Sequence, residues 1–396
     1  MSRRLRLVLG SVLAAVALVL ATALPAWAAS TITLTWVRHA ESTANAAGII
    51  DTRVPGPGLT ALGETQAQTI AATLAGNLSA HYDGIFVSDM QRTALTAAPL
   101  ATALGLTPQV EGGVREINAG LFEGGSGPVA GIGYALPPLL WTLGARFVPV
   151  LGGENGNGFE ARVDEGLAAI AATGATDPVV FSHGATIMAW TLMNVANPDF
   201  LLAVTRPLGN TAVVVVTGNP EDGWTLESWD GVAVDPNPGL LTKLFVDARA
   251  LVVAPQTSLY AIGQALRTGD PSTIAAAIRD GVVHVLTATV DFGKAVIRDV
   301  VDAVTGVLSP GPGPAATTVA HAAAAAPAPA VAVERAAAAR TSVRVSPAAP
   351  RSRTAQPGDA ARAVSPAAAQ PRTAGKRAAV PAPARATARA QHRDAA

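Results

Sequence analysis

The sequence predicts an α/β protein, a three-layer sandwich in which a mostly parallel sheet carries helices on both faces. Short runs of apolar and β-branched residues alternate with longer segments whose apolar residues recur at helical spacing, as such a sheet requires. Beyond residue 236 the helical spacing continues without strands, which predicts a C-terminal helical appendage. From residue 310 the chain is almost entirely Ala, Pro, Arg, Ser and Thr, which predicts a disordered tail.

Five segments have the length and composition of strands. The predicted strands are residues 32–37, 83–89, 178–184, 211–218 and 224–230. The last two flank the turn sequence NPEDG. Helical segments separate the earlier strands, which are therefore expected to run parallel.

Four helical segments accompany these strands, and Thr60 fits the N-cap of the first. They are residues 61–76, 90–104, 159–173 and 185–196. Two segments interrupt the alternation. Residues 124–153 form an insertion that is first rich in glycine and then strongly apolar, and residues 238–308 predict a run of short helices.

The first 28 residues predict an export signal. Three arginines precede the uncharged apolar residues 7–24, and Ala-Trp-Ala at 26–28 fits the small-x-small cleavage pattern. The alternative is an uncleaved anchor, since about 18 apolar residues can just span a bilayer. Either way, the rest of the chain is expected to be secreted or associated with the cell envelope.

The predicted organisation has four parts, each with a distinct composition. They are a signal peptide at 1–28, an α/β domain at 29–235, a helical extension at 236–309 and a disordered tail at 310–396.

Cysteine content and charge limit the possible functions. The chain has no cysteine, which excludes disulfides, thiolate metal sites and cysteine nucleophiles. The net charge of zero hides an asymmetry, because residues 311–396 hold 12 of the 28 basic and 3 of the 28 acidic residues. A basic tail suits an anionic envelope or membrane surface. Its lack of aromatic residues argues against specific binding of nucleic acid.

Two of the predicted strands end in a histidine, His39 and His183. Ligands of α/β sheets gather at the carboxyl ends of the strands. The two histidines are therefore expected to meet at one edge of the sheet, where Arg38 adds a positive charge.

Six motifs occur in a characteristic order and spacing. They are RHAEST (38–43), LTALGETQA (59–67), SDMQRTALTA (88–97), REINAGLFEG (115–124), GGENGNGFEARV (152–163) and FSHGAT (181–186). In this arrangement the chain resembles the histidine phosphatase superfamily, in its phosphoglycerate-mutase-like branch. The resemblance covers about residues 32–230, roughly half of the chain.

The resemblance implies that His39 is the nucleophile and becomes a phosphohistidine. Arg38 and Arg92 would grip the phosphoryl oxygens, and His183 would be the second histidine of the site. These residue types suit phosphoryl transfer, in which catalysis is mostly positioning and charge stabilisation. Arginine is always charged and its planar fork matches a phosphate. Two arginines and a protonated histidine would neutralise a phosphate dianion without a metal, and no cofactor is expected.

The resemblance also implies that Glu116 donates a proton to the leaving oxygen, and that Asn45 is a further phosphate contact. An acid near a phosphate tends to keep its proton, because like charges disfavour the ionised form. Glu111 and Glu123 compete with Glu116 for this role, but the REINAG context favours Glu116. Asn45 can also be read as a turn residue.

The chain departs from the family pattern at two positions next to the histidines. Ala40 stands where a glycine is usual, but it removes no reactive group. Gly184 follows His183 in place of an acidic residue, which separates the chain from the acid-phosphatase branch.

The insertion bears on the substrate, because the segment at this place tends to cap the pocket in this family. Arg146 is its only charged residue among many apolar ones. The sequence therefore favours a phosphomonoesterase over a mutase, with an apolar leaving group or a membrane-proximal site. The simpler interpretation is a helix or hairpin that packs on the domain. A phosphoglycerate-mutase-type phosphotransferase and an inactive scaffold that binds the envelope are the alternatives. Phosphorylated small molecules are the expected substrates.

Overall fold

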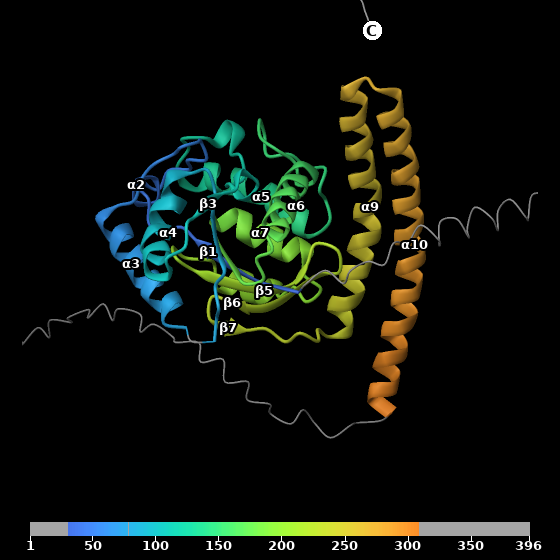
Figure 1. Ribbon diagram of the computed structural model, residues 1–396. Coiled ribbons are helices and arrows are strands. Elements are labelled where there is room, and N and C mark those ends of the chain that lie inside the picture. Colours follow the sequence, from blue (N-terminus) through green and yellow to red (C-terminus); the bar gives the residue numbers. More distant parts are fainter. Residues whose placement is uncertain (1–30, 78, 309–396) are drawn as a thin grey trace, which may run out of the picture. The chain divides into compact units, whose positions relative to one another are not determined.

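The computed structural model describes residues 31–77 and 79–308. Its centre is a seven-stranded sheet with the order β3-β2-β4-β1-β5-β6-β7 (Figure 1). The strands are β1 (Ile32–Arg38), β2 (Gly84–Val87), β3 (Gln109–Val110), β4 (Pro178–Ser182), β5 (Val213–Asn219), β6 (Gly223–Trp229) and β7 (Val232–Ala233). The α/β class expected from the sequence is therefore confirmed.

The sheet has a parallel half and an antiparallel half. The pairs β1–β4, β4–β2 and β2–β3 are parallel, whereas β1–β5, β5–β6 and β6–β7 are antiparallel. The sheet is thus mixed rather than mostly parallel. A short turn joins β5 to β6, and only antiparallel neighbours can be joined so tightly.

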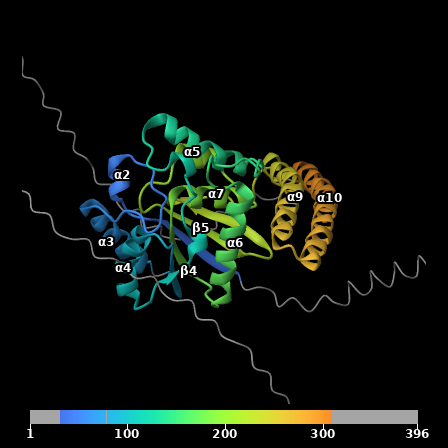
Figure 2. The ribbon, with the colours of Figure 1, turned by 90° about the horizontal axis from the view of Figure 1, so that it is seen from above.

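Helices cover both faces of the sheet, which makes three layers (Figure 2). Side chains of adjacent residues on a strand point to opposite faces. Accordingly, Val37 and Phe181 pack with α3 (Ala61–Ala75) and α4 (Gln91–Leu104). Trp36 and Val180 belong instead to a second buried cluster, which includes side chains of the three helices on the other face. Those helices are α5 (Gly127–Thr142), α6 (Gly156–Ala172) and α7 (Gly184–Asn194).

Shorter elements complete the domain. They are α2 (Thr43–Ala47), α8 (Phe200–Thr205) and two 3₁₀ turns, η1 (Gly112–Val114) and η2 (Gly120–Phe122). The insertion predicted at 124–153 forms α5 and the loop that follows it, and Trp141 on this helix is fully buried. The insertion thus packs on the domain.

Two long helices follow the sheet, α9 (Leu240–Thr268) and α10 (Pro271–Leu308). The expectation of several short helices was wrong, because Pro255 lies within α9 without ending it. The two helices pack along each other, and the turn between them begins at Gly269, whose φ of 69° suits glycine. By length and composition, residues Pro271–Thr305 could cross a membrane, and no other helix among the described residues could.

The predicted signal peptide (1–28) and tail (310–396) lie outside the described residues. The boundaries expected near residues 235 and 309 stay predictions.

Candidate active site

The two histidines meet at the carboxyl ends of neighbouring parallel strands. Arg38 and Ser182 are register partners at the ends of β1 and β4, and the His39 amide donates to the Ser182 carbonyl over 3.0 Å. His183 is the N-cap of α7. The ring centroids of His39 and His183 lie 5.1 Å apart, with the rings edge to face. The sheet thus brings together the residues that the sequence placed at strand ends.

The surroundings of His39 determine which ring nitrogen carries the proton. Nδ1 lies 2.7 Å from the carbonyl of Ala40, which can only accept, so Nδ1 donates. Nε2 accepts from Nε of Arg92 over 3.0 Å. Burial and the charges of Arg92 and Arg38 hold the pKa of His39 well below 6.5. The ring is therefore neutral near neutral pH, and the lone pair on Nε2 faces a cation.

Arg92 lies in the first turn of α4 and is 3% exposed. Besides contacting His39, it donates from Nη2 to the carbonyl of Asp51 over 3.2 Å. A Cβ on Gly56 would come within 2.9 Å of its Nη1, and the φ of +69° at Gly56 also favours glycine. Burial lowers the pKa of Arg92, and the nearby carboxylate of Glu116 opposes this shift.

Arg38 leaves the end of β1 and donates from Nη1 to the carbonyl of Leu208 over 2.6 Å. Its guanidinium lies against Gly184, where a Cβ would come within 3.2 Å of Nε. The glycine that departs from the acid-phosphatase pattern therefore makes room for Arg38.

His183 is fully buried, and Ser88 positions its ring. The hydroxyl of Ser88 lies 2.8 Å from Nε2 of His183. Ser88 is itself held by the amide of Met90 at 3.2 Å and by the hydroxyl of Thr93 at 3.0 Å. Burial and the charge of Arg92 lower the pKa of His183 well below 6.5. Sequence reasoning gave Ser88 no role, although it begins the SDMQRT motif.

Three buried nitrogen atoms of the arginines and of His183 have no hydrogen-bond partner among the described residues. They are Nε of Arg38, Nη1 of Arg92 and Nδ1 of His183. An unpaired buried polar group is costly, and an unpaired cation more so. A bound anion would supply acceptors for such nitrogens, and the two guanidiniums would neutralise its charge.

Glu116 caps the helix that His183 begins. Its carboxylate accepts from the amides of Ile117 at 2.9 Å, Thr186 at 3.0 Å and Ala185 at 3.3 Å. The hydroxyl of Thr186 also donates to it over 3.0 Å. Glu116 is thus held at the positive end of α7, the same helix end that carries His183.

The two competing carboxylates have other partners. Glu123 accepts from the amide and hydroxyl of Thr52 and pairs with Arg53 at 3.4 Å. Glu111 caps η1 by accepting from the amide of Gly113 over 2.9 Å. The charge of Glu116 acts on both Arg38 and Arg92.

Asn45 is linked to His39 through one intervening side chain. It is part of the capping box of α2, in which its Oδ1 accepts from the amide of Ser42 over 3.1 Å. Oδ1 also accepts from Nδ2 of Asn210 at 3.2 Å, and Asn210 donates to the carbonyl of His39 at 3.0 Å. Asn45 therefore supports the loop after His39, and this contact runs through Asn210, which sequence reasoning missed.

A cavity of about 590 Å³ adjoins Glu116. Eight of the ten residues that line it are polar or charged; the ten are Thr52, Arg53, Val54, Arg115, Glu116, Asn118, Gly120, Glu123, Glu154 and Arg162. The apolar side chains of the insertion do not line it. Leu136, Leu139 and Phe147 are exposed to solvent instead. The expectation of an apolar cap over the leaving group is therefore not supported.

Each arginine that lines this cavity is paired with a carboxylate. Arg162 pairs with Glu154 at 2.8 Å, Arg115 pairs with Asp89 at 2.5 Å, and Arg53 pairs with Asp51 and Glu123. No arginine of the cavity lining is left to hold a second anionic group. Within residues 31–77 and 79–308, no cluster of three or more His, Asp or Glu side chains could hold a metal ion.

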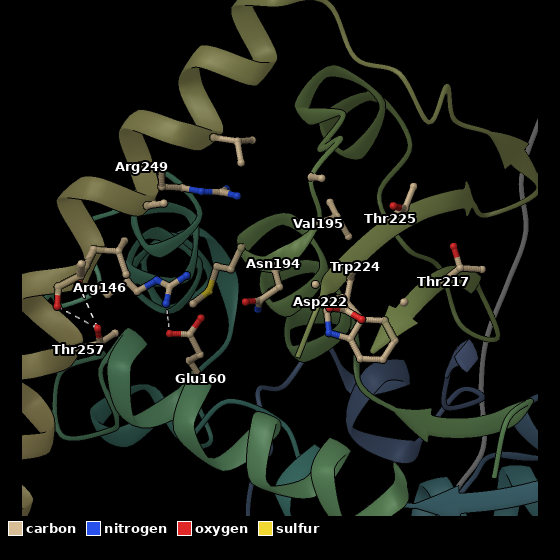
Figure 3. Close-up of a pocket in the computed structure, with 18 of the residues that line it drawn as sticks. Arg146, Glu160, Asn194, Val195, Thr217, Asp222, Trp224, Thr225, Arg249 and Thr257 are labelled. Atoms are coloured by element: carbon tan, nitrogen blue, oxygen red, sulfur yellow. Dashed lines mark hydrogen bonds and ion pairs between the residues drawn. The ribbon is translucent and has the colours of Figure 1, made fainter. Parts of the chain in front are cut away.

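A second cavity, of about 730 Å³, lies between α9 and the ends of β5, β6 and α7 (Figure 3). None of the six predicted site residues lines it. Arg249 reaches into it from α9 and donates from Nη1 to the carbonyls of Thr142 and Leu192, over 2.9 and 2.6 Å. Arg249 thus caps the C-terminal ends of α5 and α7 and attaches α9 to the domain. A buried Arg146–Glu160 ion pair lies below it.

A protein-family model described as histidine phosphatase superfamily (branch 1) matches residues 34–231. Among curated proteins, the PE-PGRS family protein PE_PGRS11 of Mycobacterium tuberculosis is 48% identical over 287 residues, which are 69% of this chain and 49% of that protein. A probable phosphoglycerate mutase, GpmB of Yersinia enterocolitica, is 38% identical over 87 residues, 22% of this chain and 39% of that protein. The chain spans about half the length of these relatives or less.

Solved structures with a similar fold include two mycobacterial proteins. The chain is 25% identical to "Mycobacterial hydrolase 1", with a TM-score of 0.42 and coverage of 51% of this chain and 100% of that one. It is 24% identical to a mycobacterial glucosyl-3-phosphoglycerate phosphatase, with a TM-score of 0.41 and coverage of 50% and 99%.

Proposed function

The chain belongs to the histidine phosphatase superfamily, and we propose that it is an exported phosphomonoesterase that acts through a phosphohistidine on His39. The observation that carries the proposal is that three buried nitrogens of Arg38, Arg92 and His183, the residues that adjoin or contact His39, have no hydrogen-bond partner in the described chain. A phosphoryl group has the charge and the number of oxygens that these donors require.

In the first step, Nε2 of His39 attacks phosphorus and the bond from phosphorus to the leaving oxygen breaks. Arg38 and Arg92 hold the equatorial oxygens, and their charges stabilise the transition state. Glu116 in its acid form gives the leaving oxygen a proton, so the alcohol departs neutral.

In the second step, water attacks phosphorus opposite His39, and the nitrogen–phosphorus bond breaks. Glu116, now a carboxylate, takes the proton from the water, which restores its acid form. His39 regains its neutral state with the proton still on Nδ1, because the Ala40 carbonyl holds that tautomer throughout.

His183 need not be charged to bind the phosphoryl group. When the hydroxyl of Ser88 donates to Nε2, the neutral ring carries its proton on Nδ1, the nitrogen without a partner in the described residues. Nδ1 then donates to a phosphoryl oxygen. The lowered pKa of His183 is consistent with this neutral form.

We propose an uncharged, hydroxyl-bearing leaving group. Most residues that line the cavity beside Glu116 are polar or charged, and its arginines are already paired with carboxylates. A mutase must also hold a second anionic group, for which this cavity offers no unpaired cation among its lining residues. This argument favours hydrolysis over phosphotransfer. Export, proposed from residues 1–28, favours it as well, because a mutase needs cytoplasmic metabolites.

The test is a panel of phosphomonoesters with uncharged polar, apolar aryl and carboxylate-bearing leaving groups. Free phosphate and phosphate transfer to a second substrate are measured in parallel, with and without a metal chelator. We expect release of phosphate, preference for the uncharged polar group, and no effect of the chelator. His39→Ala should lower turnover by at least about a thousandfold.

His81→Ala is the matched control, because His81 is exposed and lies outside the site. It should keep full turnover. Transfer in excess of release would instead identify a mutase-type phosphotransferase, and full activity of His39→Ala would refute the mechanism.

A further inference from the structure

The last helix of the structure, α10, exposes a long apolar face. It packs along α9, and no other described helix or strand shares an extended contact with it. In Figures 1 and 2, α9 lies between α10 and the sheet. Only 6% of the most apolar 18-residue window of α10 is buried. On soluble proteins, large aliphatic side chains rarely form such a long continuous exposed surface.

The exposed side chains fall on one side of the helix. Those that are at least two-fifths exposed are Ile278, Val282, Val283, Leu286, Val290, Ile297, Val300, Val301 and Val304. At about 100° per residue they occupy an arc of about 140°. The buried positions Gly281, Ala295 and Asp299 lie on the side that faces α9. We call the arc of exposed side chains the outer face of α10.

A polar strip separates the outer face from the side that contacts α9. It contains Asp280, Thr287, Asp291, Lys294 and Arg298. The outer face itself contains one charged residue, Arg279, near the start of the helix. The helix thus has a second apolar face, which points away from α9 and is not needed for packing against it.

Neither a place in the core nor a role as a signal sequence accounts for α10. A core helix would be mostly buried, and a signal sequence would lie near the N-terminus, but α10 is neither. It cannot span a bilayer while it packs along α9, because α9 is anchored to the folded domain through Arg249 and Gln256. The remaining arrangement is a helix that lies in the plane of a surface.

The charge of the adjoining chain indicates which surface. Leu308 ends α10, and residues 311–396 contain 12 basic and 3 acidic residues. An apolar helix face that is followed in the sequence by a basic segment matches an anionic membrane, where burial of side chains and attraction to headgroups act together. We propose that the outer face of α10 docks in the plane of an anionic lipid surface, and that the basic tail strengthens this contact.

Two double variants with equal charge test the proposal. Leu286→Glu with Val290→Glu places two acids on the outer face, whereas Thr287→Glu with Thr305→Glu places two acids on the polar side. Both change the net charge by the same amount, so electrostatic repulsion alone affects them equally. The chain from Ala29 to Ala396 is mixed with vesicles of phosphatidylcholine, with or without phosphatidylglycerol, and sedimented at low and high salt.

We expect the wild-type chain to bind the anionic vesicles. The outer-face variant should lose about tenfold or more of this binding, because it removes apolar burial at the lipid boundary. The polar-side variant should lose far less. Deletion of residues 309–396 should remove the part of binding that is sensitive to salt.

Equal loss in both double variants would show that charge alone drives binding and would refute the outer-face contact. Failure of the wild type to bind anionic vesicles would refute the proposal outright. A dimer in the wild type that the outer-face variant alone converts to a monomer, without vesicle binding, would identify a second copy as the true occupant. Thermal unfolding and phosphatase turnover, unchanged in both variants, exclude misfolding.

Discussion

The active site and α10 depart from the usual pattern of burial in opposite directions. At the site, His39 and Arg92 are only 3% exposed and His183 is fully buried, although all three are polar. On α10, Leu286 and Ile297 are 62% and 68% exposed, although both are aliphatic. Folded proteins ordinarily bury the second kind of side chain and expose the first.

In each region, the unusual burial indicates the kind of partner that the region binds. Neighbouring groups give His39, Arg92 and His183 hydrogen bonds, but three nitrogens of Arg38, Arg92 and His183 stay without a partner in the described residues, and an anion would supply acceptors for them. The exposed aliphatic residues have no such neighbours, and the partner they need is an apolar surface. The site therefore selects a ligand through hydrogen-bond donors at fixed positions. The outer face of α10 selects its partner only through its apolar area and through the charge of the basic tail. Substitutions should consequently act on the two regions independently.

After His39 itself, substitution of Arg92 should have the largest effect on the site. Arg92→Lys keeps the charge but loses the fork that contacts both Nε2 of His39 and the phosphoryl oxygens. We expect turnover to fall by about a hundredfold to a thousandfold, as for removal of one donor to a developing oxyanion. Steady-state hydrolysis of a phosphomonoester measures this. Arg279→Lys on α10 is the control, and it should not change turnover.

Substitution of Ser88 should have a smaller effect. Ser88→Ala leaves Nε2 of His183 without the hydroxyl that lies 2.8 Å from it and holds the ring in place. We expect turnover to fall about tenfold, the equivalent of about 1.4 kcal/mol. KM should change less, because both arginines remain. A fall as large as that of Arg92→Lys would mean that Ser88 contacts the substrate directly.

Acid should destabilise the domain through the buried histidines. Their pKa values are lowered well below 6.5, so below pH 6.5 the unfolded chain binds more protons than the folded one. The free energy of unfolding should therefore fall as the pH drops from 6.5 toward the folded pKa values, by at most about 1.4 kcal/mol per pH unit for each histidine. Denaturant titrations at several pH values measure this slope.

His183→Gln should make the slope shallower, whereas exposed His81→Gln should not change it. The lowered pKa of His39 also affects how turnover depends on pH. Because the pKa of His39 is depressed, its neutral form persists below pH 6.5, and turnover should not titrate at that pH. An inflection near pH 6.5 that His39 controls would contradict the buried geometry.

Substitution of Arg249 should have the smallest effect on turnover. Arg249→Ala leaves the carbonyls of Thr142 and Leu192 without their donor. We expect a loss of about 2 to 4 kcal/mol in the free energy of unfolding. Turnover should change less than about twofold, since the site is built on other elements. Arg267→Ala, at the exposed end of α9, is the control. A large loss of turnover in Arg249→Ala alone would show that α9 supports the site.

The residue pattern within a short segment predicted those elements that interactions within the same segment determine. The strand at 32–37 and the helix capped by Thr60 follow from alternation, helical spacing and one side-chain cap, and both appear where expected. The antiparallel half of the sheet depends on how β5 pairs with β1, a contact between distant residues that no local pattern encodes. The lengths of α9 and α10 were missed because Pro255 and Gly269 look alike as helix breakers in a sequence, but only Gly269 ends a helix.

The candidate site was predictable where a residue acts through its own chemistry. His39, Arg38, Arg92 and His183 were assigned through motifs that resemble those of the family, and their side chains suit a phosphate; the structure brings His39, Arg92 and His183 together. Ser88 and Asn210 act by holding other residues in place, and a serine or an asparagine in a loop carries no such signal. Of the two interpretations of the insertion, packing on the domain was confirmed and the apolar cap was not, because apolar composition does not tell which way Leu136 and Phe147 face.

The central claim is that His39 forms a covalent bond to phosphorus during turnover. Rapid acid-free quenching of the wild-type enzyme with a radiolabelled phosphomonoester, followed by peptide mapping, tests it directly. The account predicts one base-stable, acid-labile phosphate on the peptide that contains His39, formed and lost at rates compatible with turnover. Absence of any protein-bound phosphate while phosphate is being released, or a label on a different residue, would contradict the account.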